Sequence, residues 1–87
     1  MSISIELFGI ARARAGVAEV QLEAITFGDA LRDLARKVPA LTEAIIVDGT
    51  LAPGWLVSLD GAEFLADLEA RLPQDARLLL ISSQAGG

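Results

Sequence analysis

The feature that most constrains the fold is an apolar run near the end of the chain. Leu78, Leu79, Leu80 and Ile81 follow one another with no polar residue between them. Successive side chains of a strand point to opposite faces of its sheet, so a strand of this composition is apolar on both faces. We therefore predict that Arg77–Ser82 is a central strand of a sheet.

Alternation of apolar and polar residues, the pattern of half-buried strands, predicts four further strands. They are expected near residues 2–8, 17–22, 55–59 and 63–65. In the first of them, Ile3, Ile5 and Leu7 alternate with polar residues, and this strand is expected to pair with the second. Asp60-Gly61, between the last two, is a strong signal for a hairpin turn.

The clearest helix is predicted over residues 27–38. Thr26 can cap its N-terminus, with Asp29 as the reciprocal partner of a capping box, and Pro39 closes the helix. Its apolar residues recur at spacings of three and four, which places them on one face. They are Ala30, Leu31, Leu34 and Val38.

Two segments between the strands are less regular. Residues 10–15 are rich in Ala and Arg, which favours a short helical turn, and Gly16 is placed to end it. Residues 40–52 fit either a strand or a helical turn. The order of elements predicts an α+β fold in which one mixed sheet packs on one main helix, with the first and last strands parallel at the centre.

Composition narrows the class of protein. With 87 residues, 53% of them hydrophobic, the chain is expected to fold as one domain around one core. The net charge of -5 and the scattered basic residues argue against a nucleic-acid partner. The N-terminus does not resemble a secretory signal, and no apolar run approaches the ~18 residues of a membrane span. We expect a cytoplasmic protein that binds neither nucleic acid nor membrane.

The residue types that the chain lacks narrow its chemistry further. It contains no Cys, His or Tyr, which removes the thiolate and imidazole ligands of metal sites and the usual nucleophile and base pairs. We therefore predict that the chain is not an enzyme, and that it has no catalytic residues and no metal site of its own.

The last residues form a separate unit. We predict a folded domain over residues 1–82 and a flexible tail over residues 83–87, which contains no hydrophobic anchor and ends in Gly86-Gly87. Glycine has no Cβ, so this backbone can pass through a narrow channel, which suits a tail threaded into a partner's active site. A chance Gly-Gly end and an expression scar are the alternatives.

Four short motifs, taken in their order along the chain, resemble those of the ubiquitin-like sulfur carriers of bacteria. Residues 78–87 look like the ending of these proteins, and residues 7–12 match early aromatic and basic residues of the small subunit of molybdopterin synthase. Residues 26–34 lie where that family places its Thr-x-x-x-Ala-Leu helix start, and residues 57–61 stand in for its Val-Asn-Gly hairpin. Two departures are Asp60 in place of that Asn and Gln74 in place of a Gly before the last strand.

The resemblance implies a β-grasp, ubiquitin-like fold and a carrier function. An E1-like adenylating enzyme would activate the carboxylate of Gly87 with ATP and Mg²⁺, and a sulfur donor would then convert it to a thiocarboxylate. Gly86 and Ala85 would thread through the partner's active site. The acceptor would be the large subunit of molybdopterin synthase or an analogous enzyme, and the carrier itself would bind no cofactor.

A docking surface is expected on the outer face of the last strand. By alternation, Leu78 and Leu80 face the helix, whereas Leu79 and Ile81 face outward, where Phe8 can join them as a partner interface. The alternative is that these side chains pack under a loop.

Three functions remain open at this stage. The leading one is sulfur donation in molybdopterin biosynthesis, and the second is sulfur donation to thiamine or another product. The third is a ubiquitin-like interaction module whose Gly-Gly end is inert.

Overall fold

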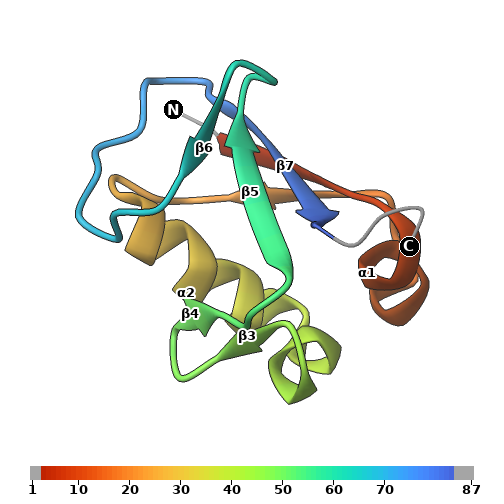
Figure 1. Cartoon of the computed structure of the whole chain (residues 1–87). Coiled ribbons are helices and arrows are strands. Elements are labelled where there is room, and N and C mark those ends of the chain that lie inside the picture. Colours follow the sequence, from red (N-terminus) through yellow and green to blue (C-terminus); the bar gives the residue numbers. More distant parts are fainter. Residues whose placement is uncertain (1–2, 84–87) are drawn as a thin grey trace.

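A mixed sheet lies across one long helix in the computed structural model, which describes residues 3–83 (Figure 1). The helices are α1 (Gly9–Ala15), α2 (Phe27–Lys37) and the 3-10 helix η1 (Pro39–Glu43). The strands are β1 (Ile3–Leu7), β2 (Glu19–Leu22), β3 (Ile46–Val47), β4 (Thr50–Leu51), β5 (Trp55–Leu59), β6 (Glu63–Leu65) and β7 (Arg77–Ser82). Of the predicted tail, Ala85, Gly86 and Gly87 lie outside the described residues.

The main sheet has the strand order β2-β1-β7-β5-β6, with β7 in the middle. β1 runs parallel to β7, and β5 lies antiparallel on the other side of β7. The predicted central position of β7 and its parallel pairing with β1 are therefore confirmed. Because parallel neighbours cannot be joined by a tight turn, the chain between them must cross over, and α2 is part of this crossover.

Local interactions fix the start of α2. The Thr26 hydroxyl accepts a hydrogen bond from the Asp29 N–H at 3.1 Å, and the Asp29 carboxylate accepts one from the Thr26 N–H at 3.2 Å. This is the capping box that the sequence predicts. The helix ends at Lys37, one residue earlier than expected, because Val38 serves as its C-cap.

The core lies between α2 and the inner face of the sheet. Leu78 and Leu80, at the centre of β7, are both 0% exposed, so the predicted facing of this strand is confirmed. They pack with buried residues of the neighbouring strands and of α2. These are Ile3, Ile5, Leu7, Leu22, Phe27, Ala30, Leu31, Leu34 and Val57.

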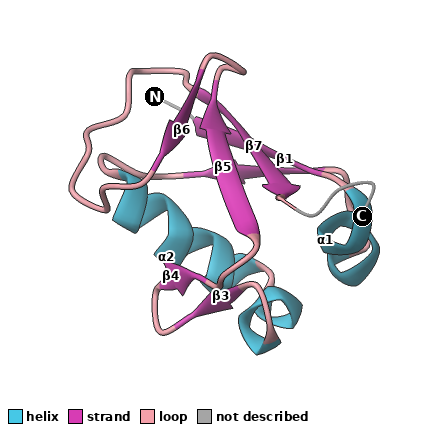
Figure 2. Ribbon diagram, viewed as in Figure 1, coloured by secondary structure: helices cyan, strands magenta, loops and turns pink. Residues whose placement is uncertain are grey.

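The ambiguous segment 40–52 contains both of the expected kinds of structure. It begins with η1 and continues into the small two-stranded sheet of β3 and β4, which lies beside α2 (Figure 2). Leu41, Ile45 and Ile46 are buried in the core. Two-residue strands are too short to show an alternation of apolar and polar residues. The buried apolar residues of this segment therefore fit the pattern of a strand and that of a helical turn equally well.

The short helix α1 and its ends differ slightly from the expectation. The first strand ends at Leu7 rather than at residue 8, because Phe8 is the N-cap of α1. Gly16 ends α1 in the left-handed conformation, with φ of 76°, and its N–H donates to the Arg12 carbonyl. This confirms the role of Gly16 as a helix stop.

We predict that two neighbouring leucines of β7 contribute very differently to stability. Leu80→Ala removes a fully buried side chain and should lower the free energy of unfolding by about 2–5 kcal/mol. Leu79→Ala, on the half-buried outer face, should lower it by only about 1 kcal/mol. Chemical denaturation of both variants measures the difference, and equal losses would contradict the assigned faces.

Candidate functional site

The face of the sheet opposite the core carries an apolar patch. Directly paired residues of neighbouring strands point to the same face. Leu79 pairs with Ser58, which in turn pairs with Phe64, and Ile81 pairs with Leu56. We call Leu56, Phe64, Leu79 and Ile81 the outer patch.

Exposure of the outer patch is uneven. Phe64 is 59% exposed, whereas Leu56, Leu79 and Ile81 are half-buried by their neighbours in the sheet. Ser58, which lies between Phe64 and Leu79 in this register, is 5% exposed. The described helices bury apolar residues in the core on the other side of the sheet (Figure 2). The patch is therefore a surface that a partner protein can cover.

Phe8 lies at the end of the same face. Its backbone is extended, with φ of -130° and ψ of 156°, so it continues the outward series of Ser4 and Glu6. The ring is 39% exposed. The structure thus places Phe8, Leu79 and Ile81 on one side of the sheet, as the sequence predicts, and their role as a partner interface stays a prediction.

Charged groups border the patch on the β1 side. Glu6 pairs in register with Leu79, and its carboxylate accepts a hydrogen bond from the Arg77 guanidinium at 3.1 Å. Arg77 faces outward and is held by this contact. A polar rim beside an apolar centre is typical of protein interfaces.

The end of β7 fixes the point at which the tail begins. The Ser83 N–H donates to the Gly54 carbonyl at 2.8 Å, so the chain is still attached to the domain one residue beyond β7.

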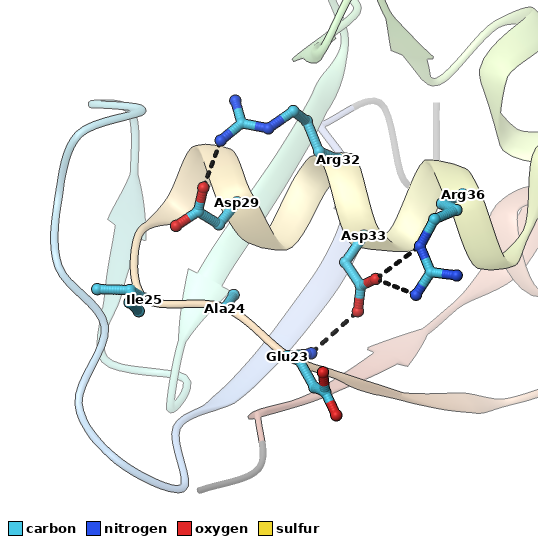
Figure 3. Close-up of a pocket in the computed structure, with 7 residues that line it drawn as sticks. All are labelled: Glu23, Ala24, Ile25, Asp29, Arg32, Asp33 and Arg36. Carbon is cyan, nitrogen blue, oxygen red and sulfur yellow. Dashed lines mark hydrogen bonds and ion pairs between the residues drawn. The ribbon is translucent and has the colours of Figure 1, made fainter.

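A second surface feature is an open groove of about 620 Å³ beside α2 (Figure 3). Four of its charged side chains pair with one another: Arg32 with Asp29, and Arg36 with Asp33 at 2.7 Å. The remaining lining residues are Glu23, Ala24 and Ile25. The pairs join neighbouring turns of one helix, so we interpret the groove as a solvated, charged helix face.

Two carboxylates of this groove, Asp29 and Asp33, have altered pKa values. Hydrogen bonds from the Thr26 backbone and hydroxyl hold the pKa of Asp29 below its usual value. Burial would raise the pKa of Asp33, but hydrogen bonds from the Glu23 N–H, Arg36 and Lys37 outweigh it and lower that pKa. Both groups are thus stabilised as carboxylates, which does not suit a general acid at neutral pH.

Within residues 3–83, no group of three or more His, Cys, Asp or Glu side chains could hold a metal ion. No helix in that range is both long enough and apolar enough to cross a membrane.

Comparisons with known proteins find similar solved structures. No family model and no curated protein matches it. SAMP1 from Haloferax volcanii is 28% identical, with a TM-score of 0.85 and 100% of both chains covered. CysO in the BexX/CysO complex of Amycolatopsis orientalis is 18% identical, with a TM-score of 0.79, and the match covers 98% of this chain and 99% of that one. A putative molybdopterin converting factor subunit 1 from Pyrococcus furiosus is 12% identical, with a TM-score of 0.75 and coverage of 94% and 97%.

The chain is similar to the ubiquitin-like sulfur carriers. The β-grasp fold and the resemblance to this class are thereby confirmed. The structures to which it is similar are small carrier proteins and not catalytic enzymes. The two matches below 25% identity establish the shared fold and nothing more.

Sequence reasoning missed half of the outer patch. Leu56 and Phe64 join Leu79 and Ile81 only through the strand register, which the alternation within a single strand does not reveal. The Asp60-Gly61 signal alone does not give this register, because a two-residue loop would pair Leu59 with Ala62, whereas the structure pairs Leu59 with Glu63 and therefore Ser58 with Phe64.

Proposed function

We propose that this chain is a sulfur carrier whose working group is the carboxylate of Gly87. An E1-like partner uses ATP and Mg²⁺ to form an acyl adenylate at this carboxylate, with release of pyrophosphate. A sulfur donor then displaces AMP and leaves a thiocarboxylate. The observation that supports this most is the combination of a carrier-like fold, matched over its whole length, with a Gly-Gly end.

The position of the tail supports the same proposal. Residues 84–87 follow a strand at the centre of the sheet, whose end is tied to Gly54. A partner that binds the outer patch therefore also sets the starting point of the tail. Gly86 and Gly87 have no side chains to obstruct a narrow channel, and Ala85 has only a methyl group.

The product that receives the sulfur is proposed to be molybdopterin. The similarity of residues 7–12 to the small subunit of molybdopterin synthase favours it, as does the fold shared with a putative molybdopterin converting factor subunit. The acceptor is then the large subunit of that synthase. The reaction needs ATP, and we place it in the cytoplasm.

A carrier for another sulfur-containing product, such as thiamine, is the second candidate. SAMP1, a small archaeal modifier protein, and CysO, solved in complex with BexX, are similar folds whose names do not point to molybdopterin. The chemistry at Gly87 is the same in both cases. An inert interaction module is the third candidate.

We predict that charge on the outer patch disrupts docking. Leu79→Glu and Ile81→Glu should each weaken binding to the adenylating enzyme at least about tenfold, because a carboxylate would be buried against an apolar partner surface. Ile25→Glu is the matched control, since Ile25 is an exposed apolar residue beside α2. Calorimetry measures the three affinities, and circular dichroism checks the fold. Normal binding by both patch variants would place the interface elsewhere.

We predict that sulfur is loaded only at the terminal glycine. Incubated with the adenylating enzyme, ATP and a sulfur donor, the intact chain should gain the mass difference between one sulfur and one oxygen atom, localised to Gly87. Removing Gly87 shifts the carboxylate by about 3.5 Å and should abolish the gain, because reactive geometry tolerates far less than that. Gly86→Val should obstruct loading.

Gln84→Ala is the control for both tail changes, since it alters the tail without changing its length. Intact-mass spectrometry with peptide mapping gives the result. An unmodified chain beside an active enzyme would favour the inert module, and modification of an internal side chain would contradict the assigned site.

A further inference from the structure

Lys37 is the only lysine of the chain; the other six basic residues are arginines. It is the last residue of α2 and therefore lies where the helix carbonyls favour a cation. An arginine serves that purpose equally well. What distinguishes lysine chemically is that its side-chain amine, once deprotonated, is a nucleophile.

The amine of Lys37 is held by two oxygen atoms from different parts of the chain. Its Nζ donates to the Gln21 carbonyl on β2 at 2.7 Å and lies 3.3 Å from Asp33 Oδ2. The side chain is 33% exposed. The amine thus joins the edge strand β2 to the end of α2, and these contacts compete with any incoming electrophile.

Asp33 is itself fixed in place. Its side chain is only 11% exposed, and its carboxylate accepts hydrogen bonds from the Glu23 N–H at 2.9 Å and from Arg36 at 2.7 Å (Figure 3). The negative charge beside Lys37 is therefore part of a rigid arrangement and does not depend on a mobile surface side chain. The carboxylate is thus held in position to contact the Lys37 amine, which must leave Asp33 Oδ2 and the Gln21 carbonyl before it can attack.

We propose that Lys37 is a latent acyl acceptor, which Asp33 and Gln21 hold in an unreactive form so that activated copies of this chain do not acylate one another. This inference rests on the proposed activation of Gly87. An acyl adenylate reacts with free amines, and a carrier with an accessible lysine would be consumed by its own copies. The single lysine of this chain is the one side chain at which that could occur.

The suppressed step is ordinary acyl transfer. The deprotonated Lys37 amine of one copy attacks the Gly87 carbonyl carbon of a second, adenylated copy. A C–N bond forms, the bond between that carbon and the AMP oxygen breaks, and AMP leaves with the electron pair. The nitrogen loses a proton to solvent, and the product is two copies joined by an amide bond.

The first test measures amine reactivity and does not depend on the proposed function. The N-hydroxysuccinimide ester of acetic acid is added to the folded chain, and acetylation of Lys37 is followed by peptide mapping, which separates it from the α-amine. Asp33→Asn keeps the shape of the side chain but removes its charge, and it should raise the rate about threefold to tenfold. Glu43→Gln is the matched control, since Glu43 pairs with Arg14 and should leave the rate unchanged.

Equal rates in wild type and Asp33→Asn would overturn the proposal. The unfolding midpoint of each variant is also measured, because a destabilised variant would be acetylated faster at Lys37 simply by unfolding. Acetylation in guanidinium supplies the rate of the unprotected amine. In wild type, Lys37 should be acetylated more slowly in the folded chain than in the unfolded chain. In Asp33→Asn, the two acetylation rates should be much closer to each other.

The second test uses the adenylating enzyme and ATP without a sulfur donor. Wild type should release pyrophosphate with little covalent dimer, whereas Asp33→Asn should give a dimer linked through Lys37, together with AMP. Adding Lys37→Arg to that variant should remove the link. A Lys37-linked dimer formed as readily by wild type would overturn the proposal, and so would its absence from Asp33→Asn while pyrophosphate is released. If no pyrophosphate is released, the proposed function fails, and the acetylation rates still decide whether Lys37 is held.

Discussion

The rest of the structure depends on the parallel pairing of β1 with β7. This pairing places the last strand in the middle of the sheet, between β1 and β5, so that both of its faces are occupied by apolar side chains. It also forces the intervening chain to cross over, and α2, which is part of that crossover, covers the inner face. Because β7 is the last strand of residues 3–83, the same pairing fixes the position of Ser83, which follows it and bonds to Gly54.

The two faces of β7 have different roles. Leu78 and Leu80 are buried against α2 and hold the domain together, whereas Leu79 and Ile81 remain half-buried on the outer patch. A strand in which apolar and polar residues alternate would have provided the buried face but no apolar outer face. The apolar run that makes β7 central is thus also the source of the proposed docking surface, and the tail begins directly beyond it.

Much of this could be predicted from local sequence. Thr26 and Asp29 define the start of α2 through neighbouring hydrogen bonds, and the run at Leu78–Ile81 indicates the central strand. The features that the sequence did not reveal depend on contacts between distant residues. Phe64 joins the outer patch through the strand register. Lys37 contacts the Gln21 carbonyl, which lies 16 positions away in the sequence. The pairing of Lys37 with Asp33, at i+4 on one helix, was predictable.

NMR tests directly whether a partner docks on the outer patch of the sheet. Amide resonances of the isotope-labelled chain are followed as the adenylating enzyme is added. If the partner docks on the outer patch, the largest perturbations should occur at Leu79, Ile81 and Phe64, with little change along the α2 groove at Asp29 and Arg36. Perturbations concentrated on α2, with the outer patch unaffected, would contradict it.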